Sequence, residues 1–277
     1  MFVVQEVLFS CHHRYTPAII NFHTQIYSLH FVANNIDCRY LRSMWQLLVV
    51  LAFSCVFAGF AYRTGKLTAA AAATGAILSV LLYAGVGVAG IIVMGAFFIM
   101  AVAATSWKYS RKLSYGIAEP KKGRRDMYQV LANGGVALLV AVQALMQPGQ
   151  NNYLLLVSAA FSSAAADTIS SELGSLYGSR FVDILNWKKA LRGQNGVVSP
   201  EGFLYGLAAS IVIAVCYLLT GPGDAFSFFV IVVAGTVGNI TDSVLGATLE
   251  ANGSLNNNQV NFINTAAAVA TAWLMLQ

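Results

Sequence analysis

The sequence predicts an all-α polytopic membrane protein, an integral membrane helix bundle with about eight transmembrane helices. Of its 277 residues, 57% are hydrophobic and 10% are charged, whereas soluble domains carry about 25% charged residues. The mean hydropathy is +0.66, and the apolar residues form runs close to the roughly 20 residues that a helix needs to cross a bilayer. A membrane β-barrel would instead show alternating segments of about 10 residues, which this sequence lacks.

Residues 1–43 do not follow the pattern of the remaining chain. This segment contains all four histidines of the chain, and Arg14 lies within it. It contains neither an apolar run long enough to span a bilayer nor a small-residue cleavage site. Met44 then directly precedes Trp45 and an uninterrupted apolar run. We therefore predict that translation starts at Met44 and that residues 1–43 are a mis-annotated extension. The alternative is an amphipathic or disordered leader. Residues 44–277 are expected to form a single transmembrane helical domain.

Eight apolar runs define the predicted helices. The boundary between the second and third runs is marked only by the uncharged segment Ala84-Gly85-Val86-Gly87. We place it there because about 40 continuous apolar residues are too long for one span. The predicted helices are Trp45–Tyr62, Leu67–Gly85, Val86–Trp107, Tyr128–Gln147, Asn152–Tyr177, Gly202–Thr220, Ala225–Thr248 and Val260–Leu276.

The basic residues predict the orientation of these helices. Lys and Arg gather in the connections 62–66, 108–126 and 178–201, whereas the connections 147–152 and 220–225 contain none. Connections rich in Lys and Arg remain in the cytoplasm. The sequence therefore predicts a multi-pass protein of the cell (inner) membrane, with these basic loops facing the cytoplasm.

Polar residues inside the predicted spans lie close to one membrane face. An ionisable side chain at the centre of a span costs about 2.5–3.5 kcal/mol and is therefore a functional candidate. Because successive helices reverse direction, the ends of the fifth and seventh helices and the starts of the fourth and eighth should meet at the cytoplasmic face. The residues at these four ends are Asp167, Glu172, Asp242, Ser243, Gln129, Asn133 and Asn261.

The types of these residues indicate a site for phosphate chemistry. Carboxylate and amide oxygens suit a hard cation such as Mg²⁺. The nearby loop contains Gly193, Gly196 and Gly202, whose main-chain N–H groups could approach an anion, and Arg192 adds positive charge. This combination is typical of phosphoryl or nucleotidyl transfer to a lipid. The sequence contains no Walker A motif, which excludes the mechanism of soluble P-loop kinases.

Structural explanations for the same residues remain open. Asp167 and Asp242 could form hydrogen bonds between helices, and Gln129 and Asn133 could hold neighbouring helices together. Basic residues such as Lys112 could do no more than set the topology and contact anionic lipid.

Four motifs in a fixed order resemble the family catalogued as domain of unknown function ninety-two, the transmembrane protein nineteen and plant phytyl-phosphate kinase family. The resemblance extends from about Trp45 to the C-terminus. A weaker similarity is to the CTP-dependent dolichol and phytol kinases. The third motif departs from the expected Gly-Thr-Asn-Gly-Gly. The motifs are Gln129-Val-Leu-Ala-Asn-Gly-Gly, Asp167-Thr-Ile-Ser-Ser-Glu-Leu-Gly, Gly193-Gln-Asn-Gly-Val-Val-Ser and Asp242-Ser-Val-Leu-Gly-Ala-Thr, followed by Asn261.

The resemblance implies an Mg²⁺-dependent kinase that transfers a phosphoryl group from CTP or ATP to an isoprenoid monophosphate in the bilayer. Asp167 and Asp242 would hold the metal, and Glu172 would assist or act as a base. The lipid tail would lie near the stripe Gly235–Gly246. Nucleic acid is not an expected partner. The residues expected to bind substrate or phosphate are Gln129, Asn133, Lys188, Lys189, Arg192, Asn195, Gly196, Ser243 and Asn261.

Two other functions are compatible with the same residues. A membrane transporter or flippase could use the intramembrane acids for a proton or for an anionic or lipid substrate. The third possibility is a membrane scaffold without catalysis. Transporters often contain inverted repeats and bind substrate at the membrane midplane, whereas the acids here lie toward one face and no convincing repeat is present.

Overall fold

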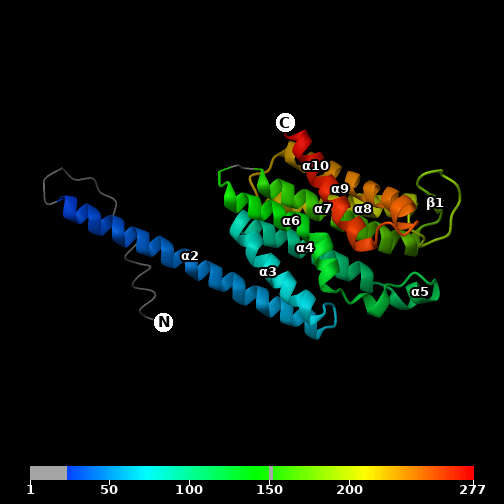
Figure 1. Ribbon diagram of the computed structural model, residues 1–277, viewed down its shortest axis with the longest axis horizontal. Helices are drawn as coiled ribbons and strands as arrows, with labels where there is room; N and C mark the ends of the chain where they lie inside the picture. The colour runs from blue at the N-terminus through cyan, green and yellow to red at the C-terminus, as the bar shows by residue number, and fades with distance from the viewer. Residues whose placement is uncertain (1–23, 150–151) are drawn as a thin grey trace. The chain divides into compact units, whose positions relative to one another are not determined.

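The computed structural model describes residues 24–149 and 152–277, with side chains described from Met44 onward. Nearly all of its elements are helical (Figure 1), which confirms the predicted all-α class. The elements are α2 (Thr24–Arg63), α3 (Ala69–Val86), α4 (Val88–Ser106), α5 (Tyr109–Ser114), η1 (Pro120–Gly123), α6 (Met127–Met146), α7 (Tyr153–Tyr177), the antiparallel pair β1 (Val182–Asp183) and β2 (Val197–Val198), α8 (Pro200–Thr220), α9 (Ala225–Leu245), the π-helical turn η2 (Gly246–Glu250) and α10 (Asn257–Met275).

The lengths and hydropathy of the helices fit a multi-pass membrane protein. Within the described ranges, seven helices are long and apolar enough to cross a bilayer, namely α2 from Met44 onward, α3, α4, α6, α7, α8 and α9. The eighth predicted run forms α10, a helix of 19 residues. The predicted break between the second and third helices is also confirmed. Gly87 ends α3 and precedes α4 with a φ of 77°, a conformation that glycine adopts without steric cost.

Residues 1–52 and residues 53–277 form two separate units. Helix α2 begins at Thr24, upstream of Met44. The prediction of a mis-annotated or disordered extension falls in part on residues 1–23, which lie outside the described residues, and translation from Met44 stays a prediction.

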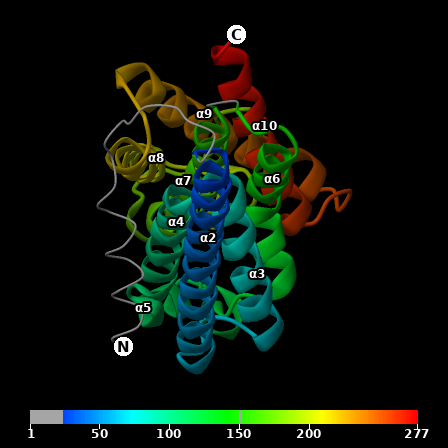
Figure 2. The same ribbon diagram turned by 90° about the vertical axis from the view of Figure 1, so that its left-hand side faces the viewer.

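Helix α7 forms the centre of the bundle. Within residues 53–277 it packs against α4, α6, α8, α9 and α10 (Figure 2). Two thirds of its most apolar stretch (67%) is buried, compared with 39% or less for the other spanning helices. The buried face consists largely of Ala and Ser, because bulkier side chains would hold five neighbouring helices apart.

Helices α7 and α9 approach each other closely along small residues. A Cβ atom on Gly238 would lie 2.0 Å from Ser163 Oγ and 2.9 Å from the backbone oxygen of Asn264. A Cβ atom on Gly235 would lie 2.1 Å from Ser162 Oγ. The α7 serines therefore occupy the space beside this stripe. The expectation that a lipid tail lies along the stripe Gly235–Gly246 is wrong for Gly235 and Gly238, which form the packing surface between two helices, whereas Asp242 and Gly246 line a cavity.

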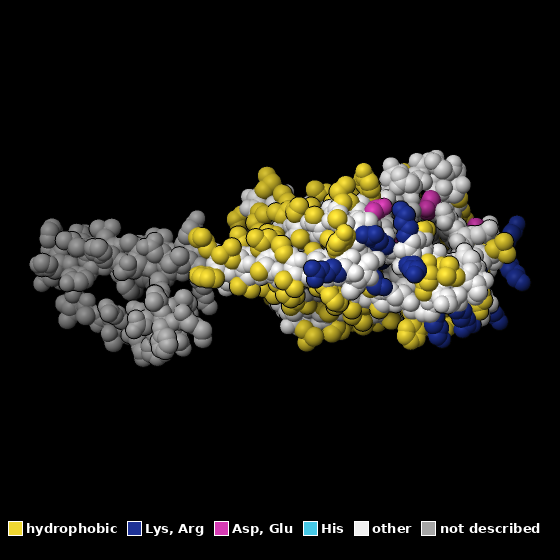
Figure 3. All heavy atoms as spheres, turned by 90° about the horizontal axis from the view of Figure 1, so that it is seen from below, with side chains coloured by type: hydrophobic (Ala, Val, Ile, Leu, Met, Phe, Trp, Pro, Cys, Tyr) yellow, Lys and Arg dark blue, Asp and Glu magenta, His cyan; other side chains and the backbone are white. Residues whose placement is uncertain are grey.

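Polar capping residues fix the helix ends at one end of the bundle. Asp126 and Gln129 form a reciprocal capping box at the start of α6, and Asn256 and Gln259 form another at the start of α10. Ser199 caps α8 through a hydrogen bond from Gly202 N. On the face shown in the space-filling view, Lys and Arg side chains gather toward one end, whereas hydrophobic side chains cover most of the remaining described part (Figure 3).

We expect Gly238→Ala to destabilise the protein, because the added methyl group overlaps with backbone as well as with a serine side chain. Overpacking of this kind costs about 1–3 kcal/mol. The control is Gly95→Ala in α4, where nothing lies within 4 Å of the added Cβ. Thermal unfolding in detergent should show a lower Tm for Gly238→Ala and an unchanged or higher Tm for Gly95→Ala. Equal Tm values for both variants would contradict the close packing of α7 and α9.

Candidate functional site

A cavity of about 960 Å³ lies where α6, α8 and α10 begin and where α7 and α9 end. Its volume is at the upper end of the roughly 300–1,000 Å³ typical of ligand sites. Residues from all four sequence motifs line it, so the predicted convergence is present in the structure. The predicted site residues in its lining are Gln129, Asn133, Asp167, Glu172, Asn195, Gly196, Asp242, Ser243 and Asn261.

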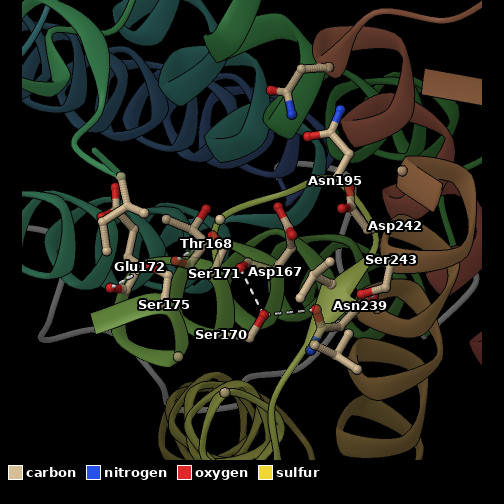
Figure 4. A pocket seen from close by; sticks show the side chains of 18 of the residues that line it. Asp167, Thr168, Ser170, Ser171, Glu172, Ser175, Asn195, Asn239, Asp242 and Ser243 are labelled. Carbon is tan, nitrogen blue, oxygen red and sulfur yellow. Dashed lines mark hydrogen bonds between the residues drawn. The ribbon is translucent and has the colours of Figure 1, made fainter. Parts of the chain in front are cut away.

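Two acidic side chains from different helices meet in this cavity. The side chains of Asp167 on α7 and Asp242 on α9 both line this cavity (Figure 4), close enough for each carboxyl group to influence the charge of the other. Asn264 of α10 donates a hydrogen bond of 2.7 Å to Asp242 Oδ2, and Ser163 Oγ of α7 donates one of 3.1 Å to Asn264 Oδ1. This buried chain of hydrogen bonds fixes the orientation of Asp242 relative to α7.

The types of oxygen atom contributed by the residues that line this cavity suit Mg²⁺. The Oδ1 atoms of Asn133 and Asn261 are buried without a hydrogen-bond partner, and both residues line the cavity. Within the part of the chain that the structure describes, no group of three or more His, Cys, Asp or Glu is arranged as metal ligands. Mg²⁺ is usually bound by one or two carboxylates together with substrate phosphates and water. The residues therefore fit an Mg²⁺ ion that binds together with a phosphate ligand.

Arg125 is a basic residue of the cavity that the sequence analysis counted only toward topology. Its guanidinium lies 5.7 Å from the ring centre of Phe97 and faces the charges of Glu119, Glu172 and Asp167. Its backbone is held on both sides, because Arg125 N donates to Lys66 O (2.9 Å) and Thr68 N donates to Arg125 O (3.0 Å). Its position directly before the capping residue of α6 is the signal in the sequence that could have identified it.

Burial changes the pKa of two groups in the loop before α6. It raises the pKa of the Glu119 carboxyl, and the negative charge of Glu172 raises it further. Burial lowers the pKa of Arg125, while the nearby acids oppose this shift. A guanidinium nevertheless stays protonated in proteins. Arg125 therefore supplies a permanent positive charge to the cavity.

Glu250 and the turn η2 also belong to the cavity, although neither was predicted from the sequence as part of the site. Glu250 contacts the side chains of Asn195 and Asn257 at the cavity. Gly196 packs against this turn, and a Cβ atom there would lie 2.2 Å from Ala247 Cβ. Its φ of 73° also favours glycine. Gly196 is thus required by close backbone packing, in addition to lining the cavity.

The structure does not bring the three predicted loop cations into this cavity. Lys188 and Lys189 line a separate, smaller cavity formed by residues 183–194. The Arg192 guanidinium lies between two aromatic rings, 4.5 Å from the ring centre of Tyr115 and 4.9 Å from that of Phe181. Among the residues lining the main cavity, positive charge comes instead from Lys121, Arg124 and Arg125.

Three of the predicted phosphate-binding residues make hydrogen bonds within their own helices or caps. Gln129 Oε1 accepts a hydrogen bond of 3.0 Å from Asp126 N. Asn133 Nδ2 donates to Gln129 O at 2.9 Å, and Ser243 Oγ donates to Asn239 O at 3.2 Å. Of the Asn133 side chain, only the amide nitrogen is used in this way, and the carbonyl oxygen has no hydrogen-bond partner.

Glu172 forms an ion pair with Lys112 inside the protein. Lys112 is fully buried and also donates a hydrogen bond of 2.6 Å to Ala104 O. The pair connects α5 to the ends of α4 and α7. The five-residue spacing from Asp167 directs Glu172 away from the pair of Asp residues (Figure 4). Lys112 therefore does more than set the membrane topology.

Removing one partner of the Lys112–Glu172 ion pair should strongly lower the free energy of unfolding. We expect Lys112→Met to destabilise the protein by about 3–5 kcal/mol, because Glu172 is left buried without a counter-charge. Glu172→Gln in the same chain should recover a large part of this loss. Chemical unfolding in detergent of the two single variants and the double variant measures the coupling. Additive effects of the two substitutions would show that the ion pair does not contribute to stability.

Comparison with known proteins identifies relatives of the chain. Residues 52–269 match the family described as "Integral membrane protein DUF92", which confirms the resemblance drawn from the motifs. The Arabidopsis thaliana "Protein VTE6, chloroplastic" is 33% identical over 222 residues, covering 76% of this chain and 66% of that protein. The chain thus spans just under two thirds of this plant relative.

Two further relatives are described as uncharacterized membrane proteins. The one from Synechocystis is 34% identical over 203 residues, covering 71% of this chain and 77% of that protein. The one from Methanocaldococcus jannaschii is 29% identical over 226 residues, covering 81% and 92%. No solved structure matches the chain.

Proposed function

The chain belongs to the integral membrane protein DUF92 family, and on this premise we propose that it is an Mg²⁺-dependent lipid-phosphate kinase. It transfers the terminal phosphoryl group of CTP or ATP to an isoprenoid monophosphate of the phytyl or geranylgeranyl type. The family resemblance to plant phytyl-phosphate kinase supplies the substrate class. The observation that carries the proposal is the pairing of Asp167 and Asp242 in a cavity that also contains Arg125. We further propose that this cavity lies at the cytoplasmic face of the cell membrane, which is supported by the excess of Lys and Arg in the loops at this end of the helices.

The charge of the cavity supports a site that binds a cation and a phosphate together. Its lining contains six acidic side chains and three basic ones. Because Lys112 compensates only Glu172, the remaining lining is still acidic and would repel a bare phosphate. Asp167 and Asp242 would hold a divalent cation, whose charge would remove this repulsion.

Different residues would bind the metal ion and the phosphates. Asp167 and Asp242 would hold Mg²⁺, together with the free carbonyl oxygens of Asn133 and Asn261. The bound metal ion would neutralise the charge of the reacting phosphate oxygens and orient them. Arg125 would form charge-assisted hydrogen bonds to the same phosphates. Asn195 lies beside Asp242 (Figure 4) and would orient the nucleotide phosphates from the loop.

The transfer makes one P–O bond and breaks another. A phosphate oxygen of the lipid attacks the terminal phosphorus, and the bond from that phosphorus to the nucleoside diphosphate breaks. The products are a lipid diphosphate and a nucleoside diphosphate. A phosphate monoester has a second pKa of about 6, so its oxygen is already ionised near pH 7 and needs no general base. Glu172 is therefore free to remain paired with Lys112, and we assign it a positioning role.

The proposal is tested with the full chain in detergent, phytyl or geranylgeranyl monophosphate, CTP or ATP with labelled terminal phosphate, and Mg²⁺. We expect Asp167→Asn and Asp242→Asn each to lower kcat by about 100-fold or more, because each removes charge that acts on the transferring group. Arg125→Gln should lower kcat/KM for the nucleotide. The control Lys188→Gln/Lys189→Gln changes two basic residues outside the main cavity and should retain activity.

Two outcomes of this assay would reject the proposal. Absence of labelled lipid diphosphate with every acceptor and both nucleotides would favour a transporter or flippase. Full activity of both Asp variants would show that the paired carboxyl groups are not part of the reaction.

A further inference from the structure

The rim of the cavity has a charged section and an apolar section. Residues that line the cavity and remain exposed mark its openings. The loop 119–126 contributes exposed charged side chains, among them Lys121 and Arg124. Outside this loop, large apolar lining residues are exposed, among them Trp187 (72% exposed), Leu204 (62%) and Ile240 (43%), beside polar ones such as Gln194 and Asn195. Large exposed apolar side chains at the opening of a cavity mark a binding surface for an apolar ligand.

The apolar section continues into the lipid-facing surface of α8. Leu204 lies in the first turn of α8, and Ala208, Ile211, Val215 and Leu218 follow it at helical spacing. All five residues are exposed in the bundle. Because α8 is a membrane-spanning helix, this stripe faces the hydrocarbon of the bilayer. The cavity and the bilayer thus share a boundary at Leu204.

Helix α9 also has an exposed apolar face that reaches the cavity, but at the C-terminal end of the helix. Ile240 lines the cavity, and Phe229 and Phe226 lie 11 and 14 positions earlier on the same helical face. Both phenylalanines are exposed. The exposed apolar surfaces of two adjacent spanning helices therefore each end at the cavity.

The seam between α7 and α9 offers no route for a hydrocarbon chain. Behind Asp242, Gly238 is in contact with Ser163, and Gly235 is in contact with Ser162 and Ser210. These contacts leave no space for even one added methyl group. A chain attached to a headgroup in the cavity therefore cannot follow this seam, whereas the exposed apolar residues of the rim offer an exit.

We propose that the hydrocarbon chain of the lipid acceptor leaves the cavity past Trp187, Leu204 and Ile240 and lies in the bilayer along the exposed stripe of α8. This inference rests on the proposed function for the identity of the headgroup. In this arrangement the phosphate reaches the paired Asp carboxyl groups while the methylene groups stay out of water. The nucleotide has a separate, polar approach past the loop 119–126. Leu204 and Ile240 are thus specificity-determining residues for the chain of the acceptor.

Photo-crosslinking tests the path of the chain without relying on turnover. The probe is phytyl monophosphate that carries a diazirine within its chain, added to the full protein in lipid vesicles. Mass spectrometry should locate labels near Leu204 and Ile211, and excess unlabelled phytyl monophosphate should suppress them. Suppressible labels on α3 or α4, or on buried residues of α7, would overturn the inference.

Substitutions test the same path through kinetics. Leu204→Trp and Ile240→Trp should raise KM for phytyl monophosphate severalfold, while KM for the nucleotide and for the short acceptor isopentenyl monophosphate stays unchanged. Leu219→Trp is the matched control, because Leu219 is 79% exposed on the same helix and does not line the cavity.

Failure of the inference is distinguishable from failure of the proposed function. Equal effects of Leu204→Trp on long and short acceptors, or no effect on either, would overturn the path while the kinase activity stands. A wild-type protein that forms no lipid diphosphate from any acceptor would overturn the proposed function, and the inferred path with it.

Discussion

Two acidic side chains can lie side by side within this helix bundle only because α7 and α9 pack almost backbone to backbone. The approach depends on Gly235 and Gly238 facing Ser162 and Ser163, where no further atom fits. The same serines then connect the helices, since Ser162 donates to the backbone of α9 and Ser163 donates to Asn264. Small residues are the usual means by which membrane helices approach closely. Here they also bring Asp167 and Asp242 into the same cavity, and the proposed metal site depends on that proximity.

The basic residues of this protein have three different physical roles. Lys112 is buried and compensates Glu172, which holds the loop after α4 against α7. Arg192 lies between aromatic rings and stabilises the loop that carries Gly196. Arg125, fixed through its backbone, extends its charge into the acidic cavity. Charge counted along a sequence predicts orientation relative to the membrane, whereas the role of each cation depends on the partner that folding provides.

Nearly all of the helices could be predicted from the sequence, because bilayer thickness constrains the length of each apolar run. The break at Gly87 and the meeting of the four motifs follow from the same constraint and from the alternating direction of the helices. The cations of the site could not be predicted in this way. Lys188 and Lys189 lie close to the glycines in sequence, but the pairing of β1 with β2 leaves them at a separate cavity. The packing of Gly235 and Gly238 could not be predicted either, because a glycine stripe can equally face a ligand or a helix.

The account depends most on Asp167 and Asp242 holding one divalent cation together. Electron paramagnetic resonance of Mn²⁺, added to the purified protein with a non-hydrolysable nucleotide, measures this directly. The account predicts one bound Mn²⁺ per chain that is lost in Asp167→Asn and in Asp242→Asn, and is retained in Asp224→Asn, which changes an exposed carboxyl at the opposite end of α9. Unchanged Mn²⁺ binding in both site variants would contradict it.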